Sequence, residues 1–125
     1  MKNALFIAVA VALSASITPT LAQDATQVDA KHYKVEFEND QVRVLRVKYG
    51  VKEKSSLHEH PALVSVFLTD ATVKMTGADG KSTEMPVKAG SATWNDGTKH
   101  LPENIGDKPF EVILVEMKGK PAAKK

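Results

Sequence analysis

The chain has 125 residues, with 17 basic and 15 acidic residues, a formal net charge of +2 and no cysteine. This length allows one domain, and the lack of cysteine excludes disulfides, thiolate nucleophiles and thiolate metal ligands. The excess of positive charge lies at the ends, because residues 23–117 carry 12 basic and 15 acidic residues. With one Trp, two Tyr and no basic cluster among aromatic residues, nucleic-acid binding is not supported.

The first 22 residues have the layout of a secretory signal peptide. Lys2 precedes an apolar run from Ala4 to Leu13, and small residues ending in Ala22 offer a cleavage site. The apolar run is too short to cross a bilayer, so we expect no stable membrane insertion after cleavage. An uncleaved amphipathic anchor is the alternative. Cleavage would make the protein periplasmic or secreted.

The remaining chain predicts an all-β fold. Residues 23–38 are interpreted as a loose polar lead-in and a first strand, residues 39–117 as a single small barrel, and residues 118–125 as a basic tail. Short runs rich in Val, Ile, Leu, Phe and Thr recur about every 8–12 residues between turn signals, a spacing typical of sandwiches and barrels. Within them, Leu45, Val47 and Tyr49 alternate onto one face. No segment shows a sustained helical period.

Two histidines stand one residue apart at the start of a strand-like run. Side chains at i and i+2 of a strand share a face, so His58 and His60 project together while Glu59 points away. Imidazole is a common metal ligand near neutral pH. Taken alone, such a pair is more typical of solvated or hydrogen-bonded histidines than of a metal site. His32, in the polar lead-in, is interpreted as a free surface histidine.

A second segment follows about forty residues later along the chain. Gly90 opens a short strand, residues 95–97 predict a turn, and His100 begins the next strand, with Asn104 on the same face. Such a hairpin can carry a third imidazole across the barrel to the first two. Asn104 is expected to bind turn backbone rather than the second nitrogen of a ligand histidine.

Together, the two segments resemble the motifs of the cupins, small β-barrels with a metal site inside. The second cupin motif is Gly, five residues, Pro-x-Gly, two residues, His, three residues and Asn. It is matched by Gly90, Gly97, His100 and Asn104, although the segment is one residue short and Asp96 replaces the proline.

The first cupin motif is Gly, several residues, His-x-His, three or four residues, a metal-binding Glu and a later Gly. It is matched by Gly50, His58 and His60, with a longer gap after the glycine. Where the family places its Glu, this chain has Val64 and Ser65, and the closing glycine is also missing. The resemblance therefore implies a site without the carboxylate ligand.

Over residues 39–117, the resemblance implies a jelly-roll barrel with a metal site at His58, His60 and His100. Three neutral imidazoles keep positions open for water or substrate, and Fe(II), Zn(II), Mn(II), Ni(II) and Cu(II) all tolerate them. Such cupin sites resemble those of cysteine dioxygenase and acetylacetone dioxygenase. The implied function is a metal-dependent oxygenase acting on a small molecule. The alternatives are a non-catalytic module that binds a small ligand or metal, and a barrel that has lost its metal. Since cupins commonly pair through strand edges, a homodimer fits all three.

Four charged residues and the tryptophan are further candidates for a role in the site. Glu59 and Glu103 are the nearest acid–base candidates in the sequence, and both are expected to face outward. Arg43 and Arg46 lie on opposite faces of their strand, so one of them can clamp an anionic substrate inside the barrel, although a surface role is the default. Trp94 is expected to pack in the core or at the rim, with pocket lining as the alternative.

Overall fold

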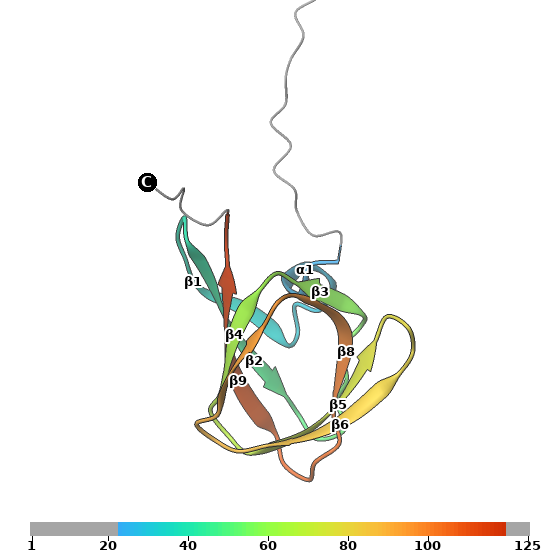
Figure 1. Ribbon diagram of the computed structural model, residues 1–125. Helices are drawn as coiled ribbons and strands as arrows, with labels where there is room; N and C mark the ends of the chain where they lie inside the picture. The colour runs from blue at the N-terminus through green and yellow to red at the C-terminus, as the bar shows by residue number, and fades with distance from the viewer. Residues whose placement is uncertain (1–22, 120–125) are drawn as a thin grey trace, which may run out of the picture.

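The computed structural model describes residues 23–119 (Figure 1). The predicted signal peptide and residues 120–125 of the predicted tail lie outside this range. Within it, the chain forms nine strands and one four-residue helix, which confirms the all-β prediction. No helix in residues 23–119 has the length and apolar character needed to cross a bilayer.

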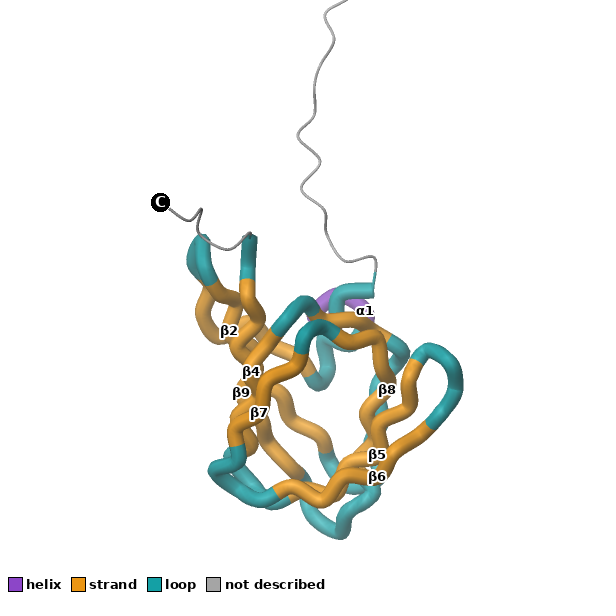
Figure 2. Tube along the Cα trace, in the orientation of Figure 1, coloured by secondary structure: helices purple, strands orange, loops and turns teal. Residues whose placement is uncertain are grey.

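The strands form two antiparallel sheets that surround a common interior (Figures 1 and 2). The five-stranded sheet runs in the order β1 (Tyr33–Glu38), β2 (Val42–Tyr49), β9 (Phe110–Met117), β4 (Leu63–Phe67), β7 (Ala92–Asn95). The four-stranded sheet runs in the order β3 (His58–His60), β8 (Thr98–Asn104), β5 (Ala71–Gly77), β6 (Ser82–Val87). Apart from the hairpins β1–β2 and β5–β6, neighbours in the sheets are distant in sequence, which brings together residues from both halves of the chain.

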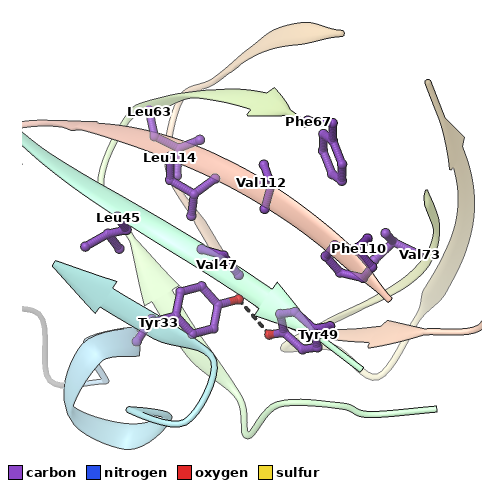
Figure 3. Packing of buried hydrophobic residues seen from close by; sticks show 11 residues of the cluster. Tyr33, Leu45, Val47, Tyr49, Leu63, Phe67, Val73, Phe110, Val112 and Leu114 are labelled. Carbon is purple, nitrogen blue, oxygen red and sulfur yellow. Dashed lines mark hydrogen bonds between the residues drawn. The ribbon is translucent and has the colours of Figure 1, made fainter. Parts of the chain in front are cut away.

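The core consists of side chains that alternate onto the inner faces of the strands. Leu45, Val47 and Tyr49 of β2 are buried, as the sequence pattern predicted. Figure 3 shows them beside buried residues of β9, among them Phe110 and Val112. The interior between the sheets is therefore mostly aliphatic and aromatic.

The segment before β1 is packed against the barrel, so the expectation of a loose lead-in was wrong. Asp24 caps helix α1 (Ala25–Val28) and accepts a hydrogen bond from the Thr26 backbone N–H at 2.9 Å. Ala25 is fully buried. The Glu59 backbone N–H donates to the Gln23 carbonyl at 2.8 Å, which ties this segment to β3. A helix of one turn is too short to show the period by which helices are predicted.

A cavity of about 510 Å³ lies inside the barrel. Two of the strands that line it, β6 and β7, each form the edge of a sheet and are exposed along almost their whole length. Met85 of β6 and Trp94 of β7 line the cavity and are 39% and 56% exposed. The cavity therefore meets solvent at these two edge strands, and Trp94 is a rim residue.

Candidate metal centre

The pairing of β3 with β8 places three histidines on one face of the sheet. His58 lies directly opposite His100, and His60 lies opposite Thr98. Because directly opposed residues have Cβ atoms about 5 Å apart, His100 is adjacent to the pair formed by His58 and His60. The third imidazole thus arrives on the neighbouring strand of the same sheet, not from across the barrel.

The turn before β8 depends on a glycine. Gly97 has a φ of 120° and its N–H donates to the Asn95 side-chain oxygen at 2.9 Å. A Cβ at this position would lie 3.4 Å from the His60 carbonyl oxygen. The space would accept a Cβ in van der Waals contact, so the positive φ is what favours glycine in this turn. This is the glycine that the motif comparison singled out.

The three imidazoles converge. Their ligand nitrogens all lie within 4.8 Å of one another, and no other group of three His, Cys, Asp or Glu in residues 23–119 is arranged to hold a metal ion. The ring centroid of His58 lies 4.8 Å from that of His60 and 4.9 Å from that of His100. His58 is completely buried, His60 is 3% exposed, and His100 is partly buried.

Hydrogen bonds at Nδ1 leave the Nε2 atoms of His58 and His60 without a partner, and the Nε2 atom of His100 has none either. His58 Nδ1 lies 2.9 Å from the Ser56 carbonyl oxygen, and His60 Nδ1 lies 2.6 Å from a carboxylate oxygen of Glu116. Both partners accept, so the Nδ1 atoms carry the protons and the Nε2 lone pairs are free. The Nε2 atoms of His58, His60 and His100 are buried and have no hydrogen-bond partner. Since buried polar atoms are nearly always bonded, three converging free nitrogens fit a divalent metal ion.

Burial keeps the imidazoles of His58 and His100 neutral, as metal ligation requires. Burial, reinforced by His60, lowers the pKa of His58 to about 4. Burial also lowers the pKa of His100 to about 3, with His58 and His60 adding to the effect. At neutral pH, neither ring therefore carries a proton that would have to leave before metal binds.

These shifts predict a pH dependence for the metal-free protein. As the pH falls below about 6.5, the unfolded chain binds protons at these histidines before the folded chain does, so the free energy of unfolding decreases. The decrease continues until the pH approaches the folded pKa values of about 4 and about 3. Urea unfolding between about pH 7.5 and about pH 4.5 measures it. His100→Gln should have a shallower dependence; an unchanged slope would contradict this assignment.

Glu116 supports the histidine cluster (His58, His60 and His100) through its contact with His60, although it is not itself one of the three candidate ligands. It is 1% exposed, and its second carboxylate oxygen accepts from Arg43 Nε at 2.7 Å. Arg43 also donates to Asp24 at 2.6 Å, so a chain of charged contacts runs from the N-terminal segment to His60. Such outer partners orient ligand histidines and raise their basicity.

Sequence reasoning did not single out Glu116. The signal was present, because Phe110, Val112 and Leu114 alternate onto the buried face of β9 and the next position of that face is Glu116. A carboxylate on the inner face of an otherwise apolar strand is unusual unless it is paired.

No family model matches the sequence, and no curated protein matches it. Solved structures do match. A cupin domain from Bordetella pertussis Tohama I aligns with a TM-score of 0.65 and 21% identity over 70% of this chain and 92% of that chain. A protein with a double-stranded beta-helix domain from Klebsiella pneumoniae gives 0.57 and 20%, over 72% and 74%. The chain has the cupin fold.

The polyketide cyclase RemF from Streptomyces resistomycificus also shares this fold, with a TM-score of 0.53 and 14% identity over 71% of this chain and 66% of that chain. At these identities the likeness concerns the fold. Any ligand or metal of this cupin barrel must therefore be inferred from the residues of this chain.

The other charged candidates lie outside the histidine cluster. Glu59 is opposite Lys99 on β8, Glu103 is opposite Lys74 on β5, and both carboxylates are partly exposed. Arg43 is on the inner face of β2 but is held by Asp24 and Glu116, and it does not line the cavity. It is therefore not placed to clamp an anionic substrate.

Arg46 is held on the outer face of the same strand. Its guanidinium donates to Glu36 and to Glu111, each at 2.9 Å. This is the surface role that the sequence favoured for an arginine of β2.

His32 is buried, so its interpretation as a free surface histidine was wrong. Its ring stacks on Tyr49 with centroids 4.2 Å apart, and its Nδ1 contacts Asp29 at 2.8 Å. It is 5% exposed and is not part of the histidine cluster. Its role in this cupin barrel is packing and hydrogen bonding beside the N-terminal helix.

Asn104, the last residue of β8, binds backbone in the turns that follow β8 and β2. Its side-chain N–H groups donate to the Lys108 carbonyl at 2.8 Å and the Gly50 carbonyl at 3.1 Å, and its oxygen accepts from Gly106 N–H at 3.0 Å. Asn104 is 1% exposed. The turn role favoured from the sequence is the one observed.

Asn104→Ala should therefore cost stability without changing metal affinity. Several buried backbone groups would lose their partner, at about 1–3 kcal/mol for a buried unsatisfied group. Urea unfolding measures the first effect and a zinc competition titration the second. Asn95→Ala, at an exposed turn residue, is the control and should lose less. A selective loss of metal affinity in Asn104→Ala would contradict the turn role.

Proposed function

We propose that this protein is a metal-dependent enzyme of oxygenase type. It binds one divalent ion through His58, His60 and His100 and a small molecule in the adjoining cavity. The observation that carries the proposal is the convergence of three buried Nε2 atoms without partners. His60 and His100 also line the cavity, so the histidine cluster and the space for a ligand are continuous.

In this proposal, different residues of the chain have different roles. The three histidines hold the ion, and Glu116 orients His60 through the 2.6 Å contact to Nδ1. The barrel walls surround the ligand except where the cavity meets solvent at β6 and β7. When bound, the ion would supply Lewis acidity, and a redox-active ion such as Fe(II) would add dioxygen chemistry.

A non-catalytic binding module is the second candidate, and one observation favours it. Among the described residues, no Asp, Glu, Lys or Arg lines the cavity. Burial raises the pKa of Tyr33 and that of Tyr49, so both phenols stay protonated. If the protein is an enzyme, catalysis would therefore depend on the metal and on the bound molecule, without a carboxylate base.

We also propose that the protein works outside the cytoplasm. Support for this comes from the sequence of residues 1–22, which has the three parts of a secretory signal peptide.

Oxygen consumption tests the proposal. The protein is loaded with Fe(II) and offered thiols, diketones and phenolic acids, with His58→Ala as the control. Uptake that needs metal, substrate and His58 supports an oxygenase. Metal and ligand binding without any turnover would overturn the enzyme in favour of the binding module. Failure to bind any metal would overturn the enzyme and leave only a module that binds a small ligand without metal.

A further inference from the structure

The lining of the barrel cavity restricts the chemistry of its ligand. Of the described residues around the cavity, the only ones with titratable side chains are His60, His100, Tyr33 and Tyr49. None of these described lining residues is an Asp, Glu, Lys or Arg, so no carboxylate, ammonium or guanidinium group faces the ligand. A charged group on the body of a ligand would lose its hydration without meeting an opposite charge.

The two arginines of β2 already form ion pairs with carboxylates of the protein. Arg43 is bonded to Asp24 and Glu116, and Arg46 to Glu36 and Glu111. Neither arginine lines the cavity. A carboxylate or phosphate on the part of the ligand remote from the histidines therefore has no partner.

Polar groups gather at the histidine end of the cavity. The hydroxyls of Tyr33 and Tyr49 bond each other at 2.7 Å, and the Tyr33 ring lies 4.8 Å from His58 and 5.6 Å from His60 between centroids. Nearer β7, the hydroxyls of Ser65 and Thr93 bond each other at 2.8 Å and so satisfy one another.

The cavity wall formed by β4 and β9 is mostly aliphatic and aromatic. Phe110 stacks on Tyr49 with centroids 5.0 Å apart and an angle of 17° between the rings, and Phe67 lies 6.1 Å from Phe110 (Figure 3). Val112 and Leu114 extend this wall along β9. Flat rings and branched aliphatic side chains favour an aromatic or alkyl body over a polar one.

We propose that the ligand is an uncharged hydrophobic small molecule of the phenol class, with its single oxygen head at the histidine end and an apolar body along the wall formed by Phe67 and Phe110. This inference rests on the proposed function for the place of the oxygen head, which the metal would bind. The apolar body follows from the lining alone. Amino acids and dicarboxylates are disfavoured as ligands, because each brings a second charge that meets no opposite charge away from the histidines.

The single tryptophan reports ligand binding directly. Trp94 lines the cavity, and its ring is held by a hydrogen bond from Nε1 to Asp96 at 2.7 Å. We would titrate zinc-loaded and metal-free protein with 4-methyl-, 4-ethyl- and 4-propylphenol and follow Trp94 fluorescence. Affinity should rise about fourfold per methylene, as expected for apolar burial. Tyrosine, a phenol with a zwitterionic tail, should bind at least about a hundredfold more weakly than 4-propylphenol.

Two variants locate the ligand. Phe67→Leu should weaken 4-propylphenol binding several-fold, whereas Phe37→Leu, at a residue 53% exposed on β1, should leave it unchanged. Circular dichroism confirms that both variants fold. An affinity that does not rise with chain length, or tyrosine binding as tightly as 4-propylphenol, would overturn the inference.

The two forms of the protein separate this inference from the proposed function. The rise with chain length should be present with and without zinc, because it depends on the wall. Tighter binding of every phenol in the zinc form would place the oxygen head at the metal. A rise with chain length in the metal-free form, without any zinc binding, would contradict the proposed function and the position of the head but retain the apolar body.

Discussion

His100→Ala is expected to lower zinc affinity more than any substitution outside the three histidines. Removing an outer partner of a ligand histidine costs about 10–100-fold in metal affinity, and removing a ligand itself should cost more. Without His100, only His58 and His60 would still bind the ion, and water would fill most of its coordination positions. Competition with a chromophoric chelator measures the change.

The chain contains its own matched control. Of the four histidines, His32 is the one outside the cluster; it is buried, and its Nε2 makes no hydrogen bond but lies 3.5 Å from a Glu53 carboxylate oxygen. His32→Asn should keep wild-type zinc affinity even if it loses some stability through the contact with Tyr49. Equal losses of affinity in the two variants would show that the measured zinc is not bound where the structure places it.

Glu116→Gln is expected to affect both stability and metal binding. The substitution keeps the size of the side chain but removes the charge between Arg43 and the His60 N–H. Breaking a buried ion pair costs about 3–5 kcal/mol, and the lower end applies because Arg43 keeps Asp24. Zinc affinity should fall by about 10–100-fold through the loss of orientation of His60.

Glu111→Gln is the matched control for this prediction. Glu111 is on the same strand as Glu116 but on the other face, where it bonds Arg46 near the surface. A surface ion pair contributes little to stability, so Glu111→Gln should change neither quantity measurably. Urea unfolding and zinc titration of both variants decide the matter. A Glu116→Gln protein that binds zinc like the wild type would remove Glu116 from the account of the site.

The all-β fold and the sheet face that carries the histidines were predictable because they depend on local patterns. The alternation of Leu45, Val47 and Tyr49 shows which face of β2 is buried, and the spacing of His58 and His60 puts them on one face. The placement of His100 opposite His58 needs the pairing of β3 with β8. The motif resemblance implied this neighbourhood, but the strand periodicity did not.

The supporting contacts were not predictable in the same way, because they join distant segments. Glu116 meets Arg43, which lies 73 residues away in sequence, across two paired strands. Asp24 contacts Arg43 from a segment whose sequence is polar. His32 looks solvated in a stretch of polar residues, and only the packing of that stretch against Tyr49 buries it. The absence of charge from the described cavity lining is a property of the whole barrel and of no single motif.

The metal content of the purified protein tests the three-histidine site most directly. We would reconstitute it in turn with Fe(II), Zn(II), Mn(II), Ni(II) and Cu(II), remove loosely bound ions, and measure metal per chain by elemental mass spectrometry. The account predicts about one ion per chain for at least one of these metals, because the three histidines form a single site. Retention of none of the five would contradict it and make His58, His60 and His100 ordinary residues of the barrel wall.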